Sequence, residues 1–121
     1  MRILIVDDLE ANRILLSHLV TLNDHEPIPC GSAEEALQSY REHGADVIFM
    51  DVVMPGTDGY SAAKQLKVVV GDDFVPIIFI TALQDEDALV RCLEFGDDYL
   101  VRPFNQIMFN AKIAAHIRTI E

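Results

Sequence analysis

Two hydrophobic patterns alternate along the 121 residues of the chain. Short uninterrupted apolar runs bounded by turn residues predict strands that are buried in a sheet. The predicted strands are residues 2–6, 26–30, 47–50, 76–81 and 98–101. Between them, apolar residues recur at the spacing of a helix. The predicted helices are residues 9–22, 32–43, 59–70, 85–95 and 105–120.

Capping and turn residues support several of these boundaries. Ser32 and Glu35 form a capping box at the start of the second helix, and Gly44 ends it. Pro27 and Pro29 cannot donate ladder hydrogen bonds, so the second strand is expected at the edge of the sheet.

Two of the predicted helices carry apolar series at helical spacing. In the first helix the series at helical spacing is Ala11, Ile14, Leu15, His18, Leu19 and Leu22. In the last helix the series that we expect in the core is Phe109, Ile113, Ile117 and Ile120.

Strand and helix alternate five times with short connections, which predicts an α/β fold with a doubly wound parallel sheet. We expect the flavodoxin-like strand order 2-1-3-4-5, because it puts the proline-containing second strand at an edge. The length fits one domain that spans residues 1–121. The apolar last helix runs to the end without a closing cap, so we expect a domain cut from a longer chain.

In this fold, polar residues from different strands meet at one edge of the sheet. The carboxyl ends of the strands carry Asp7, Asp8, Asp51, Thr81 and Arg102. The first and third strands are neighbours at the point where the chain reverses direction, which is where such sheets bind ligands. A single aspartate after a strand is usually a turn or helix cap. Polar groups from four strand ends in one place favour a functional site.

The composition narrows the choice of partners. The formal net charge of −11 argues against direct binding to nucleic acid or to an anionic membrane surface. No apolar run is long enough to span a bilayer. Cys30 and Cys92 show no disulfide or metal spacing, so we interpret them as buried thiols in a reducing cytosol. The four histidines show no ligand spacing either.

Together, four motifs resemble the receiver domain of the two-component response-regulator family over nearly the whole chain. They are Ile-Val-Asp-Asp at residues 5–8, Met-Asp-Val-Val-Met-Pro-Gly-Thr-Asp-Gly at 50–59, Phe-Ile-Thr-Ala at 79–82 and Asp-Asp-Tyr-Leu-Val-Arg-Pro-Phe at 97–104. The resemblance implies a phosphorelay domain that accepts a phosphoryl group from a histidine kinase or phosphotransfer protein. It also implies a cytoplasmic, bacterial pathway.

The resemblance implies a role for each motif residue. Asp51 is similar to the phosphoacceptor. Asp7 and Asp8, with Asp51 and the backbone carbonyl of Val53, are similar to the ligands of Mg²⁺ or Mn²⁺. Thr81 resembles the switch hydroxyl. Tyr99 resembles the aromatic that moves inward on activation, and Arg102 stands where the family usually has lysine.

Physical chemistry supports these roles. Crowded carboxylates repel one another, and a hard divalent cation with oxygen ligands neutralises them. Phosphoryl transfer needs positioning and charge stabilisation, which Mg²⁺, Arg102 and the Thr81 hydroxyl can supply. Ala82 leaves room for the phosphoryl group. The family has a cis bond before the equivalent of Pro103, which we expect here. The chain would catalyse only its own phosphorylation and dephosphorylation, and is not otherwise expected to be an enzyme.

Arg102 is the first departure from the family pattern. Arginine is longer than lysine and planar, so the exchange is not neutral. Arg102 either holds the phosphoryl group differently or pairs with Asp51 before phosphorylation. We expect phosphorylation to survive, and phosphate lifetime or signal propagation to differ.

Two further departures concern the switch and the surface. Gly96 is followed directly by Asp97, one residue short of the family pattern, which affects the register of Tyr99. Ile107, Met108, Ala111, Ala114 and Ala115 leave the last helix little polar face, and Leu89 replaces a commonly charged residue. Such a face suggests a homodimer or a docked output domain on the fourth helix, fifth strand and fifth helix.

Other functions fit the sequence less well. A dehalogenase-type enzyme needs a second aspartate two residues after the nucleophile, where this chain has Val53. A nucleotide or flavin site needs a glycine-rich loop after the first strand, where this chain is acidic. The remaining alternative is a degenerate receiver that acts as a phosphorylation-independent docking module.

Overall fold

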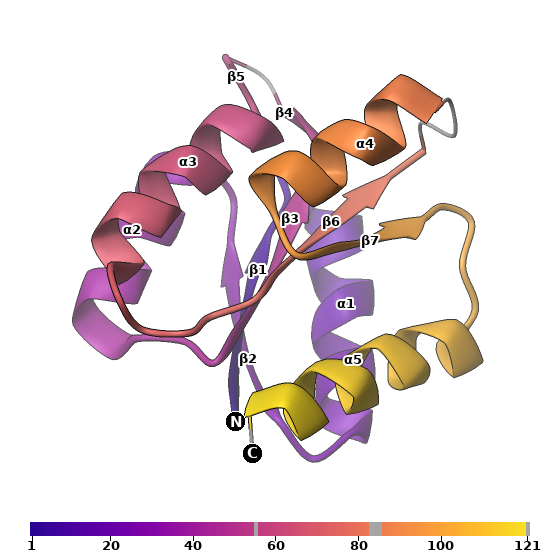
Figure 1. Cartoon of the computed structure of the whole chain (residues 1–121). Helices are drawn as coiled ribbons and strands as arrows, with labels where there is room; N and C mark the ends of the chain where they lie inside the picture. The colour runs from indigo at the N-terminus through magenta and orange to yellow at the C-terminus, as the bar shows by residue number, and fades with distance from the viewer. Residues whose placement is uncertain (55, 83–85, 121) are drawn as a thin grey trace.

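The computed structural model describes residues 1–54, 56–82 and 86–120. Its centre is a five-stranded parallel sheet in the order β2-β1-β3-β6-β7 (Figure 1). The strands are β1 (Arg2–Val6), β2 (Glu26–Cys30), β3 (Val47–Asp51), β6 (Ile77–Thr81) and β7 (Asp98–Val101). This order confirms the predicted doubly wound α/β fold, and β2 with its two prolines is an edge strand as expected.

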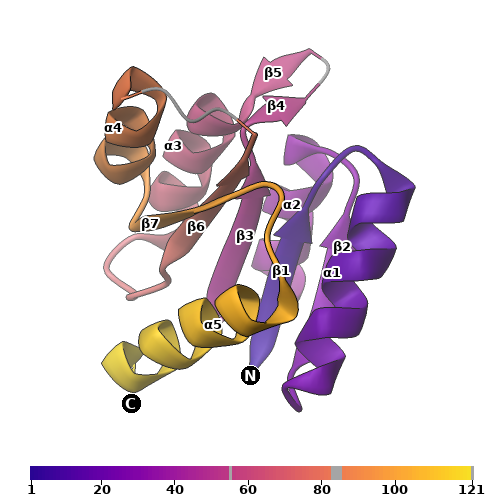
Figure 2. The same cartoon turned by 90° about the vertical axis from the view of Figure 1, so that its right-hand side faces the viewer.

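In the part of the chain that the structure describes, five helices cover the sheet on its two faces. They are α1 (Glu10–Leu22), α2 (Ala33–His43), α3 (Gly59–Val70), α4 (Glu86–Phe95) and α5 (Gln106–Ile120). Helices α1 and α5 lie on one face, and α2, α3 and α4 on the other (Figures 1 and 2). The predicted start of α4 at Asp85 lies outside the described residues. The serine cap of α2 is confirmed, because the Glu35 N–H donates to Ser32 Oγ at 3.1 Å. The Glu35 carboxylate accepts from the Gly31 N–H at 2.9 Å, one residue before the Ser32 N–H of a full capping box.

The side chains of each central strand alternate between two apolar clusters. In β1, Ile3 and Ile5 pack under α1 and α5, whereas Leu4 and Val6 pack under the other three helices. The strands β1, β3 and β6 are buried on both faces because both faces carry helices. This double burial fixes where each strand ends, and therefore where the polar residues at the carboxyl edge lie.

Helix α1 confirms the helix predicted from its apolar series, and only part of that series is buried. Of the six residues in that series, only Leu19 is buried, and it packs with Leu16 and Val20. Ile14 and Leu15 are more than half exposed. The helix is apolar on most of its circumference, so spacing alone did not distinguish the face that meets β1.

Helix α5 follows its predicted face. Phe109 and Ile113 are buried, Ile117 is partly buried, and the side chain of Ile120 lies outside the described residues. Ile107 and Met108 point away from the core and are exposed.

A short antiparallel hairpin between β3 and α3 was not predicted. Its strands are β4 (Val53–Met54) and β5 (Thr57–Asp58), with Val53 opposite Asp58. The hairpin returns the chain to Asp51, and Asp58 caps α3 by accepting a hydrogen bond from the Ser61 N–H at 2.7 Å. Strands of two residues have no periodicity that a sequence pattern could reveal.

Candidate functional site

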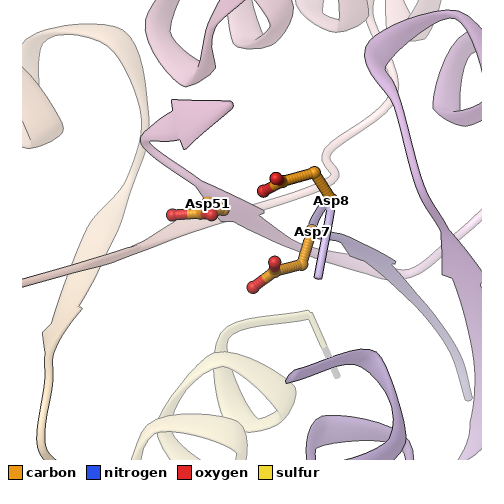
Figure 3. A group of neighbouring side chains, drawn as sticks. All are labelled: Asp7, Asp8 and Asp51. Carbon is orange, nitrogen blue, oxygen red and sulfur yellow. The ribbon is translucent and has the colours of Figure 1, made fainter. Parts of the chain in front are cut away.

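The carboxyl ends of the central strands deliver the predicted polar residues to one edge. Asp7 and Asp8 follow β1, Asp51 is the last residue of β3, and Thr81 is the last residue of β6. Arg102 directly follows β7, and its backbone N–H donates to the Thr81 carbonyl at 2.8 Å. The side chains of Asp7, Asp8 and Asp51 gather on the same side of the strand ends (Figure 3).

These three aspartates form a compact acidic cluster. Each offers a carboxylate oxygen, and the three oxygens lie within 4.8 Å of one another. Asp7 is 1% exposed and Asp51 is 8% exposed, while Asp8 is half-buried. Among the described residues, no other group of His, Cys, Asp or Glu side chains comes together in this way. Hard oxygen donors that repel one another fit a divalent cation such as Mg²⁺ or Mn²⁺.

The carboxyl group of Asp51 has a raised pKa in this acidic cluster. Burial and the neighbouring charge of Asp7 raise its pKa from 3.8 to about 6, against the opposing effect of the Arg102 guanidinium. The Val53 N–H donates to Asp51 Oδ1 at 3.3 Å and also favours the ionised form. A carboxyl group with this pKa changes its ionisation state just below neutral pH. A cation nearby would stabilise its ionised form.

Asp7 is held by three donors. Its Oδ1 accepts from the Leu9 N–H at 3.0 Å and from Asn12 Nδ2 at 3.4 Å. Its Oδ2 accepts from Arg102 Nη2 at 2.8 Å. Arg102 therefore pairs with Asp7, and not with Asp51 as one of the two sequence-based alternatives proposed.

Asn12 contributes to the site but was not predicted from the sequence. It lies one helical turn after Asp8, on the side of α1 that faces the strand ends. A polar residue at this spacing after Asp8, in the first turn of the helix, is the signal that could have identified it. Arg13 also approaches from α1, and its Nη1 donates to the Asp7 carbonyl oxygen at 2.8 Å.

A pocket of about 510 Å³ opens above the cluster. Its lining includes Asp8, Asp51, Thr81, Ala82 and Arg102. Thr81 is 2% exposed, and the small side chain of Ala82 beside it leaves the pocket open. The Arg102–Pro103 peptide bond is cis, as expected from the resemblance.

Gly59 allows α3 to begin against the backbone of Asp51 and Val52. A Cβ atom at this position would collide with the Asp51 carbonyl oxygen and lie 2.8 Å from the Val52 Cα. The Gly59 N–H donates to the Val52 carbonyl at 2.7 Å, which holds the start of α3 against the end of β3. Glycine is needed here because the two backbones approach so closely.

Tyr99 keeps a regular place in β7 despite the shortened loop before it. It lies opposite Phe79 in the strand pairing and is half-buried on the side of α2, α3 and α4. Gly96 packs directly against the Phe79 ring, where a Cβ atom would lie 2.5 Å from a ring carbon. The Lys112 ammonium group lies 5.5 Å from the centre of the Tyr99 ring.

Three further features of the described residues can be compared with the predictions from the sequence. Cys30 and Cys92 are free and buried, as predicted. None of the described helices is long and apolar enough to cross a membrane. Leu89 is half-buried, whereas its neighbours Val90 and Leu93 on α4 are each 56% exposed.

Comparison with known proteins identifies the family. The model of the response regulator receiver domain matches residues 3–114. The chain therefore belongs to the receiver domains of response regulators. It is 36% identical over 120 residues to the "Probable transcriptional regulator ycf27" of Cyanidium caldarium, covering 98% of this chain and 47% of that protein. It is 34% identical over 117 residues to the "Transcriptional regulatory protein AfsQ1" of Streptomyces coelicolor, covering 96% of this chain and 51% of that protein.

A solved structure agrees in fold over the full length. A two-component response regulator from Clostridium difficile superposes with a TM-score of 0.89 at 26% identity, covering 98% of this chain and 96% of that chain. The chain spans about half the length of the two curated relatives described above.

Proposed function

We propose that the domain receives a phosphoryl group on Asp51 from the phosphohistidine of a histidine kinase or phosphotransfer protein. The observation that carries this proposal is the position of the Asp51 carboxylate. It lies in the floor of the 510 Å³ pocket, with Asp8, Thr81 and Arg102 around it. Membership of the receiver family supports the phosphorelay role.

In this reaction an Asp51 carboxylate oxygen attacks the phosphorus atom of the donor. A new O–P bond forms, the N–P bond of phosphohistidine breaks, and the leaving histidine nitrogen keeps the electron pair and takes up a proton. A divalent cation bound by Asp8, Asp51 and the Val53 carbonyl, with Asp7 beside them, would neutralise charge on the transferred group. The chain is then a catalyst only of its own phosphorylation and dephosphorylation.

The other residues of the pocket position and stabilise the phosphoryl group. The Thr81 hydroxyl is close enough to the pocket to donate to a phosphoryl oxygen, and the Arg102 guanidinium can bind the same group through two N–H donors. Burial of Thr81 means that its movement changes packing at the end of β6. Space left by that movement is available to Tyr99 on the neighbouring strand.

The output surface in this proposal is formed by α4, β7 and α5. Exposed apolar side chains flank β7 on both helices: Val90 and Leu93 on α4, and Ile107 and Met108 on α5. A homodimer or an output domain of a longer chain would cover them. We place this activity in the cytoplasm, without direct contact to nucleic acid or membrane. A chain that sediments as a monomer before and after phosphorylation would count against the homodimer.

Labelling with a small phosphodonor tests the function. Wild type and Asp51→Asn are incubated with acetyl phosphate and Mg²⁺, and the intact proteins are weighed by mass spectrometry. We expect one phosphoryl group on wild type and none on the variant, with label lost when a chelator removes Mg²⁺. Asp58→Asn is the matched control, because this helix-capping aspartate lies outside the acidic cluster. An unlabelled wild type would favour the phosphorylation-independent docking module.

A further inference from the structure

The ion pair between Arg102 and Asp7 has a consequence for cation binding. Arg102 lines the pocket and its side chain is 27% exposed, whereas Asp7 is 1% exposed and lies behind it. Arg102 Nη2 is 2.8 Å from Asp7 Oδ2, and the other Asp7 oxygen is occupied by donors from Leu9 and Asn12. The carboxylates that line the pocket are those of Asp8 and Asp51.

The guanidinium group already supplies part of the positive charge that the cluster needs. It is always protonated, and its planar fork suits a carboxylate better than a lysine ammonium group does. A divalent cation that enters the pocket meets this fixed charge, and it finds the Asp7 carboxylate already neutralised. To use the Asp7 carboxylate, the cation must therefore displace the guanidinium group from it.

We propose that Arg102 is a positioning residue that acts through Asp7 as a built-in counter-cation and lowers the affinity of the unphosphorylated domain for divalent cations. This inference deepens the proposed function, because it concerns the cation site on which that function relies. It makes phosphorylation sensitive to the free concentration of the cation. The proposal rests on the guanidinium group of Arg102 and on its ion pair with Asp7.

The test measures cation affinity directly, without phosphorylation. Mn²⁺ is titrated into the full chain and followed by its electron paramagnetic resonance signal, with Mg²⁺ as competitor. Arg102→Gln removes the charge, and we expect the variant to bind Mn²⁺ about tenfold more tightly than wild type. Lys112→Gln removes a cation that pairs with Asp98 on α5, and we expect its affinity to stay within about twofold of wild type.

A double-mutant cycle shows whether the effect passes through Asp7. In an Asp7→Asn background, the gain from Arg102→Gln should shrink to less than about threefold, because the partner charge is already absent. Equal affinity of wild type and Arg102→Gln, or a full gain retained without the Asp7 charge, would overturn the proposal. Arg102→Met keeps the length of the apolar stem and gives the same expectation if the glutamine variant does not fold.

The cation measurement and the labelling experiment fail independently. If wild type is not labelled on Asp51 but Arg102→Gln binds Mn²⁺ more tightly, the counter-cation role stands and the phosphoacceptor function falls. If wild type is labelled and Mn²⁺ affinity does not respond to Arg102, the reverse holds.

Discussion

The ionised Asp51 carboxylate should destabilise the folded domain near neutral pH. Its pKa rises from 3.8 to about 6 on folding, because burial and the charge of Asp7 disfavour ionisation. At pH values between these two pKa values, Asp51 keeps its proton in the folded chain but has released it in the unfolded chain. The free energy of unfolding therefore falls as pH rises through this window. A shift of this size corresponds to a penalty of about 3 kcal/mol above the window.

Asp51→Asn removes this charge and keeps an acceptor for the Val53 N–H. We expect the variant to be more stable than wild type by about 1–2 kcal/mol near pH 7.5, since an amide accepts a weaker hydrogen bond than a carboxylate does. The advantage should vanish below the unfolded-state pKa, where wild type is protonated in both states. Urea unfolding followed by circular dichroism, repeated across the pH window, measures both values.

Asp98→Asn is the matched comparison with the opposite sign. Burial raises the pKa of Asp98, but hydrogen bonds from Lys112, His116 and the Tyr99 N–H outweigh burial and lower it overall. Its charge is therefore stabilising above the unfolded-state pKa, and this contribution is lost as pH falls through the folded pKa. We expect Asp98→Asn to destabilise the chain near neutral pH. An Asp51→Asn chain that is no more stable than wild type at pH 7.5, or equally favoured at pH 4, would refute the electrostatic reasoning.

Three further substitutions test separate contacts of the site and its surroundings. Arg102→Lys should keep acetyl-phosphate labelling but change the lifetime of the phosphoryl group, because the ammonium group lacks the planar fork; the same lifetime in both chains would contradict this. Gly59→Ala should cost at least about 2 kcal/mol of unfolding free energy in urea, because its Cβ collides with the Asp51 carbonyl, and a cost near zero would contradict the close approach. Tyr60→Phe loses the hydroxyl that donates to the Ala88 carbonyl at 3.3 Å, so amide exchange in α4 should quicken by several-fold, and unchanged exchange would show that this contact does not hold the helix.

The sequence predicts most of the fold because its signals are local and mutually consistent. Double-sided burial makes β1, β3 and β6 continuous apolar runs, and Pro27 and Pro29 place β2 at the edge. The hairpin of β4 and β5 escaped prediction because two residues carry no period. The buried face of α1 does not follow from the sequence, because apolar residues surround most of the helix; contact with the sheet buries Leu16, Leu19 and Val20.

The sequence predicts which strand-end residues form the site, but it does not predict which carboxylate pairs with Arg102. Strand ends bring Asp7, Asp8, Asp51 and Thr81 together once the strand order is known. Which carboxylate Arg102 binds depends on the reach of one side chain just before the cis bond to Pro103, and spacing along the chain does not encode that. The same holds for Asn12, whose contribution becomes visible only when α1 is placed against the end of β1.

Arg102 also offers a physical route from the acidic cluster to the proposed output face. Its backbone N–H is bonded to the Thr81 carbonyl, so it extends the pairing of β6 with β7, while its side chain reaches across to Asp7. The same strand carries Asp98, which binds Lys112 and His116 of α5 at 2.9 and 3.0 Å. A cation or phosphoryl group that draws the guanidinium from Asp7 therefore acts on the end of a strand whose start anchors α5. A ligand at the cluster can shift α5 only if it binds more tightly when Arg102 is released from Asp7 than when the two are paired. The difference between these two binding free energies is the coupling between the acidic cluster and α5.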